Sequence, residues 1–280
     1  MLRTRVITAV ILLASLIGIL LFGGETGWSL FVGAVLLGAF WEWGRLGLFT
    51  PALAIVYAIA GVMVYLGTAF LPAQSHPVQS FLYLASLFWL LIVPFCLRSV
   101  SIGVLANKAL FALAGWVLII AAGLALVVSK QQGIVFLLSI IAICFAADIF
   151  AYVFGKTLGR RKLAPRISPG KSWEGAAGGL LSVVALSWVT VYLATDYPLL
   201  KATWQVHAHE HWGATAFTFW LVVLSGFSIV GDLFESMLKR RAGLKDSSQL
   251  LPGHGGILDR IDAQLPVMPM AILLSGVSLV

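Results

Sequence analysis

The chain has 280 residues, of which 60% are hydrophobic and 10% are charged, with a mean hydropathy of +1.01 and a formal charge of +7. Soluble domains carry about 25% charged residues, so this composition excludes a soluble globular protein, a disordered chain and a nucleic-acid-binding domain. The two cysteines, Cys96 and Cys144, lie inside apolar runs and are too few for a disulfide scaffold. The sequence therefore predicts an all-α, polytopic helical membrane protein.

Nine apolar runs are long enough to cross a bilayer, which takes about 20 residues of helix. Membrane-spanning strands alternate apolar and polar residues, whereas these runs are apolar on all sides and rich in glycine. The first run starts like a signal peptide, but its length and the lack of an Ala-x-Ala site predict a retained span. The expected spans cover roughly residues 6–22, 28–46, 52–71, 81–97, 109–128, 133–154, 175–195, 213–231 and 262–280.

The cations are divided unequally between the two sides of these expected spans. All of the 18 lysines and arginines except Lys130 and Lys201 fall on one side. The positive-inside rule assigns that side to the cytoplasm. The pattern predicts an N-terminus inside the cell and a C-terminus outside it.

Acidic residues are concentrated in the second half of the chain. Residues 1–140 contain only Glu25 and Glu42 among the 11 acids. A hydrophobic scaffold has no need of acids at membrane boundaries, so any chemistry is expected in the second half. We therefore divide the chain into scaffold spans at 1–132 and catalytic spans at 133–280, with long cytoplasmic loops at 155–174 and 232–261.

Two polar clusters lie on either side of the first long loop. Asp148 and Tyr152 are four residues apart and share one face of the sixth expected span. Ionisable groups within a membrane are costly and usually face a partner or a wet cavity. The second cluster places a Ser-Pro-Gly turn and Lys171 before a helix start at Ser172 and Glu174, where free N–H groups attract anions. The alternative is a basic end of a span followed by a capped helix.

The third cluster occupies residues 228–262. One helix face carries residues at i, i+3, i+4 and i+7, namely Asp232, Glu235, Ser236 and Lys239. Asp259 and Asp262 are three residues apart at the start of the ninth expected span. A cationic loop with a glycine-rich turn, Gly253-His254-Gly255-Gly256, joins the two acidic helix ends.

This third cluster points to metal-assisted chemistry on a phosphate. Hard divalent cations such as Mg²⁺ take carboxylate oxygens together with substrate phosphates. Lysine and arginine side chains nearby can hold the remaining phosphate charge. The alternative interpretation is structural, with two acidic helix starts joined by a basic loop.

Two weaker signals lie elsewhere. His207, His209 and His211 alternate in a short outer loop near residues 196–212. On a strand they would share one side and could bind a metal, but a solvated histidine-rich segment is the favoured interpretation. Glu42 and Arg45, three residues apart at the inner end of the second expected span, are interpreted as a simple ion pair.

The third cluster resembles the signature of the phosphatidate cytidylyltransferases, also called CDP-diacylglycerol synthases. The matching stretch reads Ser236-x2-Lys239-Arg240-x4-Lys245-Asp246-x5-Pro252-Gly253-His254-Gly255-Gly256-x2-Asp259-Arg260-x-Asp262. The two earlier clusters are similar to the same family in Ala-Asp148-x3-Tyr152-x2-Gly155-Lys156 and in Ser168-Pro169-x-Lys171-Ser172-x-Glu174-Gly175. The resemblance is strong from about residue 145 to 265, and the N-terminal part matches only in being membrane spans.

The resemblance implies that CTP and phosphatidic acid react to give CDP-diacylglycerol and pyrophosphate, in phospholipid biosynthesis at the inner (plasma) membrane. It also implies Mg²⁺, accompanied in some members by K⁺, and it leaves a homodimer open. Asp232 and Asp259 would be the metal ligands, and the other expected catalytic residues are Lys239, Asp246 and Asp262. The expected substrate-binding residues are Asp148, Tyr152, Lys171, Ser172, Glu174, Glu235, Ser236, Arg240, Lys245, His254, Gly255, Gly256 and Arg260.

Two other functions compete with this interpretation. One is a different membrane enzyme that uses a nucleotide or an isoprenoid phosphate, such as a lipid kinase. The other is an anion transporter or channel, although transporters place polar groups near the bilayer midplane and here the acids gather at helix ends.

Overall fold

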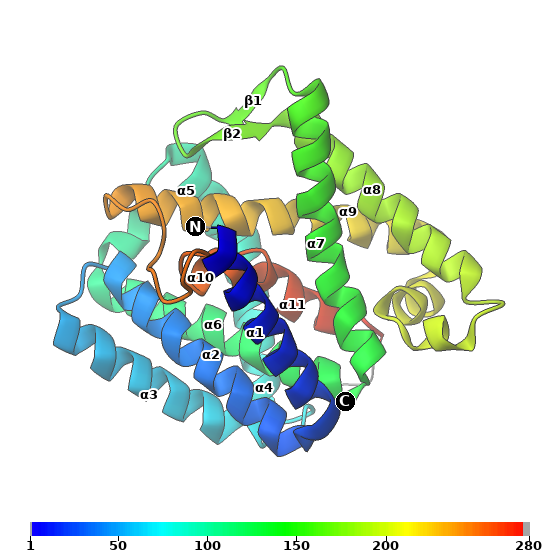
Figure 1. Ribbon diagram of the computed structural model, residues 1–280, viewed down its shortest axis with the longest axis horizontal. Coiled ribbons are helices and arrows are strands. Elements are labelled where there is room, and N and C mark those ends of the chain that lie inside the picture. The colour runs from blue at the N-terminus through cyan, green and yellow to red at the C-terminus, as the bar shows by residue number, and fades with distance from the viewer. Residues whose placement is uncertain (1, 277–280) are drawn as a thin grey trace.

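The computed structural model describes the backbone of residues 2–276 and the side chains of residues 6–276. The first half of the chain forms α1 (Leu2–Phe22), α2 (Gly24–Leu46), α3 (Pro51–Ala69), α4 (His76–Leu91), α5 (Val93–Ser99), the 3₁₀ turn η1 (Gly103–Ala106) and α6 (Lys108–Gln131). The second half forms α7 (Ile134–Leu158), β1 (Lys162–Ala164), β2 (Ser168–Ser172), α8 (Trp173–Leu193), η2 (Pro198–Ala202), α9 (Trp204–Arg241), α10 (Leu258–Ile261) and α11 (Gln264–Leu273). Figure 1 shows their arrangement.

Six helical segments among the described residues are long and apolar enough to cross a membrane: α3, α4 with α5, α6, α7, α8 and α9. The predicted all-α, multi-pass membrane fold is thereby confirmed. Helix α1 has a shorter apolar stretch, and α2 reaches 23 residues but carries Glu25, Glu42 and Arg45 and is not one of the six. The count of nine spans and the orientation of the termini stay predictions.

The ninth expected span, 262–280, is not present as one long helix. Helix α10 ends at Ile261, and after a turn α11 covers only 10 residues. Every side chain from Leu265 to Ile272 is buried, so this segment is an internal core helix in the described part of the chain. Residues 277–280 lie outside the described residues.

Helix α6 is the centre of the first half, with α2, α3 and α4 packed around it. Glycines allow the close approach of α2 and α6. A Cβ at Gly123 would lie 2.5 Å from Leu36 Cδ1, and one at Gly115 would lie 2.3 Å from Trp43 Nε1. Trp43 Nε1 donates to the carbonyl oxygen of Phe111 at 2.9 Å, which joins the two helices by a buried hydrogen bond.

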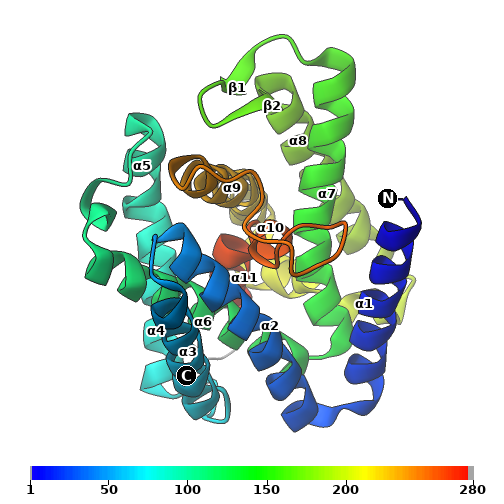
Figure 2. The same cartoon turned by 60° about the vertical axis from the view of Figure 1, so that its left-hand side comes forward.

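Helices α7 and α8 pack through small residues one turn apart on each helix. A Cβ added at Gly175 would lie 2.6 Å from Ala151 O, and one added at Gly179 would lie 2.6 Å from Ala147 O. Such close backbone contact is the usual way in which membrane helices associate. In Figure 2, α9, α10 and α11 lie between this α7–α8 pair and the group formed by α2 to α6.

The two expected cytoplasmic loops are shorter and more ordered than predicted. Within 155–174, α7 continues to Leu158 and a two-stranded antiparallel hairpin follows, which the all-α prediction missed. Its turn has Pro165 at the second position and closes with the N–H of Ile167 donating to Ala164 O. Within 232–261, α9 remains helical to Arg241.

The expected outer loop near residues 196–212 is also largely helical, because α9 begins at Trp204 and bends at Gly213, whose φ is 71°. The strand alternative for the three histidines is therefore wrong. His207 and His209 are half-buried, and their rings pack edge-on against Phe136 and Trp188. The solvated interpretation is therefore wrong for these two histidines, whereas His211 is exposed as it predicted.

Candidate functional site

A cleft of about 480 Å³ lies where α7, the hairpin, α8 and α9 meet. Residues from all three polar clusters line it, namely Asp148, Tyr152, Lys171, Ser172 and Asp232. Lys171 Nζ lies 2.6 Å from Asp232 Oδ2, so the second and third clusters are joined directly. The fold thus brings together side chains that are up to 84 positions apart in the sequence.

The small residues between α7 and α8 set the walls of this cleft. They hold the Asp148 end of α7 against the start of α8, where Ser172 Oγ accepts from the N–H of Gly175 at 3.1 Å. Glu174 accepts from the N–H groups of Arg160 and Arg161, at 3.0 and 3.2 Å. Two expected substrate-binding residues therefore have local structural partners, and of these Ser172 also lines the cleft.

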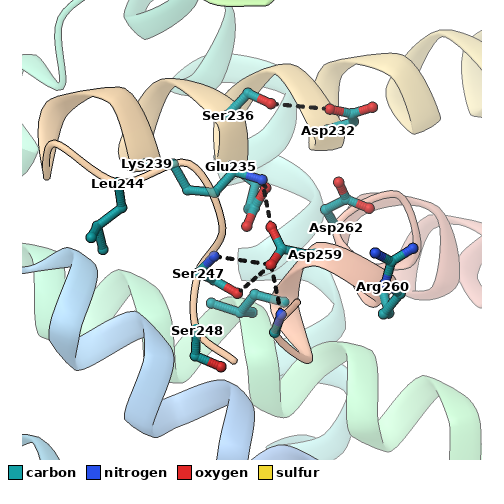
Figure 3. Close-up of polar contacts among 12 residues, drawn as sticks. Asp232, Glu235, Ser236, Lys239, Leu244, Ser247, Ser248, Asp259, Arg260 and Asp262 are labelled. Carbon is teal, nitrogen blue, oxygen red and sulfur yellow. Dashed lines mark hydrogen bonds and ion pairs between the residues drawn. The ribbon is translucent and has the colours of Figure 1, made fainter. Parts of the chain in front are cut away.

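Asp262 lies next to Asp232 because α9 approaches the α10–α11 turn closely. A Cβ at Gly231 would lie 2.3 Å from the carbonyl oxygen of Asp262. Burial, followed by the negative charge of Asp232, raises the pKa of the Asp262 carboxyl above its usual range. Figure 3 shows both carboxylates on the same side of α9, away from the loop that follows it.

Asp259 is the centre of a second polar group. Its Oδ1 is 2.6 Å from Lys239 Nζ, and its Oδ2 accepts from the N–H groups of Ser247 and Gly256 at 2.9 and 2.8 Å (Figure 3). Burial opposes ionisation of Asp259, but these hydrogen bonds and the lysine charge outweigh it and lower its pKa to about 2. Asp259 is therefore a carboxylate at neutral pH.

Lys239 stands between two acids. Its ammonium group contacts both Asp259 and Glu235, and the Glu235 side chain is only 4% exposed. The same lysine was expected to hold a substrate phosphate. Its observed partners show that it also fixes two carboxylates in place.

Glu42 belongs to this second group, although it comes from the first half of the chain. Its side chain is fully buried in α2 and accepts hydrogen bonds from the loop after α9. The expected pair with Arg45 is wrong, because Arg45 lies over the Trp41 ring and donates to Ser247 O. An acid within an apolar run was the available sequence signal, and its partner was too far along the chain to be inferred.

The remaining expected residues lie outside the first cleft. Lys245 and Asp246 line a second cleft of about 590 Å³ with Arg45. Arg240 lines another cleft, of about 410 Å³, with Arg166 and Arg241. The loop turn is closed separately, because the Arg260 guanidinium donates to the carbonyl oxygen of His254.

The donor set around Asp232 fits a hard divalent cation. Among the residues that the structure describes, no three side chains of His, Cys, Asp or Glu are arranged as a complete metal site. Magnesium needs only one or two protein carboxylates, since water and substrate phosphates complete its coordination. Asp148, Asp232 and Asp262 act on one another electrostatically, with Lys171 the cation among them. The charged residues that line the cleft are two acids, Asp148 and Asp232, and two lysines, Lys156 and Lys171, so their formal charges balance, with Asp262 adjacent as a further carboxyl group.

These features define, in a multi-pass membrane protein, a site with carboxylates and lysines suited to phosphate chemistry. A family model described as the cytidylyltransferase family matches residues 3–277. The chain belongs to the cytidylyltransferase family.

Curated relatives of high coverage share one name. A Pseudomonas aeruginosa protein named phosphatidate cytidylyltransferase is 36% identical over 96% of this chain and 95% of its own length. Proteins of the same name from Haemophilus influenzae and Brucella abortus are 32% and 31% identical, over 96% and 99% of this chain and 96% and 94% of their own lengths. The family resemblance inferred from the three clusters is confirmed.

Proposed function

We propose that the chain is a phosphatidate cytidylyltransferase that converts CTP and phosphatidic acid into CDP-diacylglycerol and pyrophosphate. The observation that carries the proposal is the cleft in which Lys171 meets Asp232 beside Asp148. The family membership and the shared name of the relatives support the same reaction.

The reaction is a nucleotidyl transfer at the α-phosphorus of CTP. A phosphate oxygen of phosphatidic acid forms the new P–O bond, and the bond between the α-phosphorus and the bridging oxygen of the β-phosphate breaks. The electron pair leaves with pyrophosphate. The lipid phosphate is already anionic at neutral pH, so positioning and charge stabilisation are more important than a strong general base.

Lys171 is suited to hold a phosphate at the cleft, because its side chain is 24% exposed and extends from the end of β2 to Asp232. Lys239 keeps Asp259 and Glu235 in place and adds positive charge beside them. Lys245, Arg240 and Arg260 would attract the remaining phosphate charge from the loop. Backbone at the glycine-rich turn would approach the nucleotide, with His254 orienting it.

Asp232 and Asp259 are the proposed ligands of Mg²⁺, with Asp262 next to Asp232 as a further carboxylate. When bound, this ion would neutralise charge on the phosphates. The protein side chains would hold the two anionic substrates close together against their mutual repulsion. A companion K⁺ remains part of the proposal, on the family resemblance alone.

We further propose that the site faces the cytoplasm at the inner (plasma) membrane. CTP is water-soluble and phosphatidic acid stays in the leaflet, so the cleft must be reached from both phases. The positive-inside distribution of lysine and arginine supports this orientation, with the N-terminus inside.

The test uses the purified full chain in detergent with phosphatidic acid, Mg²⁺ and CTP labelled either at the α-phosphate or, in a parallel reaction, at the γ-phosphate. We expect the α-label in the lipid extract with an equal amount of pyrophosphate, and the γ-label in pyrophosphate. The γ-label in lipid, without pyrophosphate release, would instead indicate a lipid kinase. Uptake of an anion by sealed vesicles without any chemistry would indicate a transporter.

A further inference from the structure

We infer that Glu42 is a positioning residue that holds the start of α10 and the loop before it, which donates to Asp259, and so sets the affinity of the site for its divalent cation. The inference rests on the proposed function, because it assigns Asp259 to that cation. It also extends the site beyond the three polar clusters, into α2 of the first half of the chain.

Four hydrogen-bond donors converge on the Glu42 carboxylate. Glu42 Oε1 accepts from the N–H of Ile257 at 2.9 Å and from the hydroxyl of Ser248. Glu42 Oε2 accepts from the N–H of Leu258 at 2.7 Å and from Ser247 Oγ at 3.0 Å. All four donors lie between Ser247 and Leu258, in the loop after α9 and the first residue of α10, more than 200 positions from Glu42.

The backbone of this segment lies directly against α2. A Cβ at Gly256 would lie 1.9 Å from Ser247 Oγ and 2.5 Å from Glu42 Oε1. One turn earlier on α2, a Cβ at Gly38 would lie 2.3 Å from the Ile257 side chain. Glycine at both positions permits the close approach on which the hydrogen bonds to Glu42 depend.

Asp259 directly follows these donors in α10, so the two carboxylates are mechanically linked. Ser247 Oγ is 3.0 Å from Glu42 Oε2 and 3.0 Å from Asp259 Oδ2, and its single proton is shared between them. The N–H of Gly256 points to Asp259, whereas the next two N–H groups along the chain point to Glu42. A shift of the loop away from Glu42 would therefore move two donors of Asp259.

The need for two acceptor oxygens explains why a carboxylate is needed at this position. A buried acid is costly unless hydrogen bonds satisfy it, and here each oxygen has two donors. An apolar residue would leave two backbone N–H groups unsatisfied, and an amide would turn one donor group toward other donors. A side chain at position 42 can thus hold the loop only if both of its terminal oxygens accept hydrogen bonds.

The decisive experiment compares Glu42→Gln with the wild-type full chain by the binding of Mn²⁺ alone, followed by electron paramagnetic resonance. Substitution of a residue that orients a metal ligand typically lowers the metal affinity by about 10- to 100-fold. We expect Mn²⁺ affinity to fall at least about tenfold, with a matching rise in the Mg²⁺ concentration for half-maximal CTP turnover. An affinity within about twofold of wild type in a folded protein would overturn the inference.

Two further variants separate positioning from folding. Tyr65→Phe removes a buried hydrogen bond from Tyr65 to Ser29 O, between α3 and α2, and should lower stability without changing Mn²⁺ affinity. Ser248→Ala removes one donor to Glu42 and leaves the Ser247 contacts, so it should weaken Mn²⁺ binding less than Glu42→Gln. If Glu42→Gln fails to fold, an unchanged Mn²⁺ affinity in Ser248→Ala would overturn the inference.

The binding measurement also separates this inference from the proposed reaction. A wild-type chain that binds Mn²⁺ but forms no CDP-diacylglycerol would refute the reaction alone. The loss of Mn²⁺ affinity in Glu42→Gln would still support the positioning role in that case.

Discussion

Replacing Asp259 by asparagine is the sharpest test of the second polar group. Asparagine keeps the shape of the side chain, removes its charge and presents an amide donor to a site that contains only donors. Three groups lose a charged acceptor, namely Lys239, Ser247 and Gly256. We expect the protein to fold and its turnover to fall by about 10²-fold or more, as for other losses of electrostatic stabilisation.

The structure also gives the size of the stability loss expected in Asp259→Asn. A pKa that falls from 3.8 to about 2 corresponds to about 2 kcal/mol in favour of the charged carboxylate of Asp259. Because this pKa is lowered by folding, the stability that it contributes is present above pH 3.8 and is lost as the pH falls toward 2. Between pH 5 and 8 the loss in Asp259→Asn should therefore be constant, at about 4 to 8 °C in melting temperature.

The assay is a pair of measurements on the purified chain in detergent. Melting is followed with a chelator present, so that bound metal does not contribute, and turnover is followed with CTP, phosphatidic acid and Mg²⁺. Asp196→Asn is the matched control, because Asp196 is exposed in the turn after α8. Near-normal turnover in Asp259→Asn, or a melting difference that grows from pH 5 to 8, would refute the reasoning.

Further predictions concern the lysines, the loop and the metal. Lys171→Met breaks the ion pair with Asp232 and should lower turnover at least about tenfold, whereas Lys171→Arg should retain more, as kinetics in detergent will show. Lys239→Met should raise the KM for CTP more than that for the lipid, and an unchanged nucleotide dependence would argue against its phosphate role. Gly256→Ala should abolish turnover, since its Cβ would overlap a serine hydroxyl, while Gly226→Ala, which meets no atom within 4 Å, should be active. Chelation should stop turnover, and added Mg²⁺ should restore it.

The polar clusters could be predicted from the sequence because each is local. Asp148 and Tyr152 share a helix face, and Lys171 precedes a helix start, as spacing alone indicates. That these residues share one cleft could be inferred only from the family resemblance or from the fold, since nothing in the local sequence relates Lys171 to Asp232. Asp259 lies within α10 and contacts Lys239, whereas Asp262 follows the end of α10, where the charge of Asp232 acts on it.

The predictions that the structure did not support failed for different physical reasons. Glu42 was assigned a partner on its own helix because only local partners can be read from spacing, whereas its donors come from the loop after α9. The hairpin at 162–172 is too short to show strand alternation. The ninth span was overestimated because hydropathy does not distinguish a buried core helix such as α11 from one that crosses the lipid.

The contact between α7 and α8 has a consequence for the axial register of the cleft. Because the backbone carbonyls of Ala147 and Ala151 touch two glycines of α8, the helices can slide past each other only in whole turns. One turn is about 5.4 Å, far more than the length of a hydrogen bond. A slip by a single turn would carry Asp148 out of the cleft. Gly175 and Gly179 of α8 therefore determine how Asp148 on α7 is aligned with Lys171 in β2.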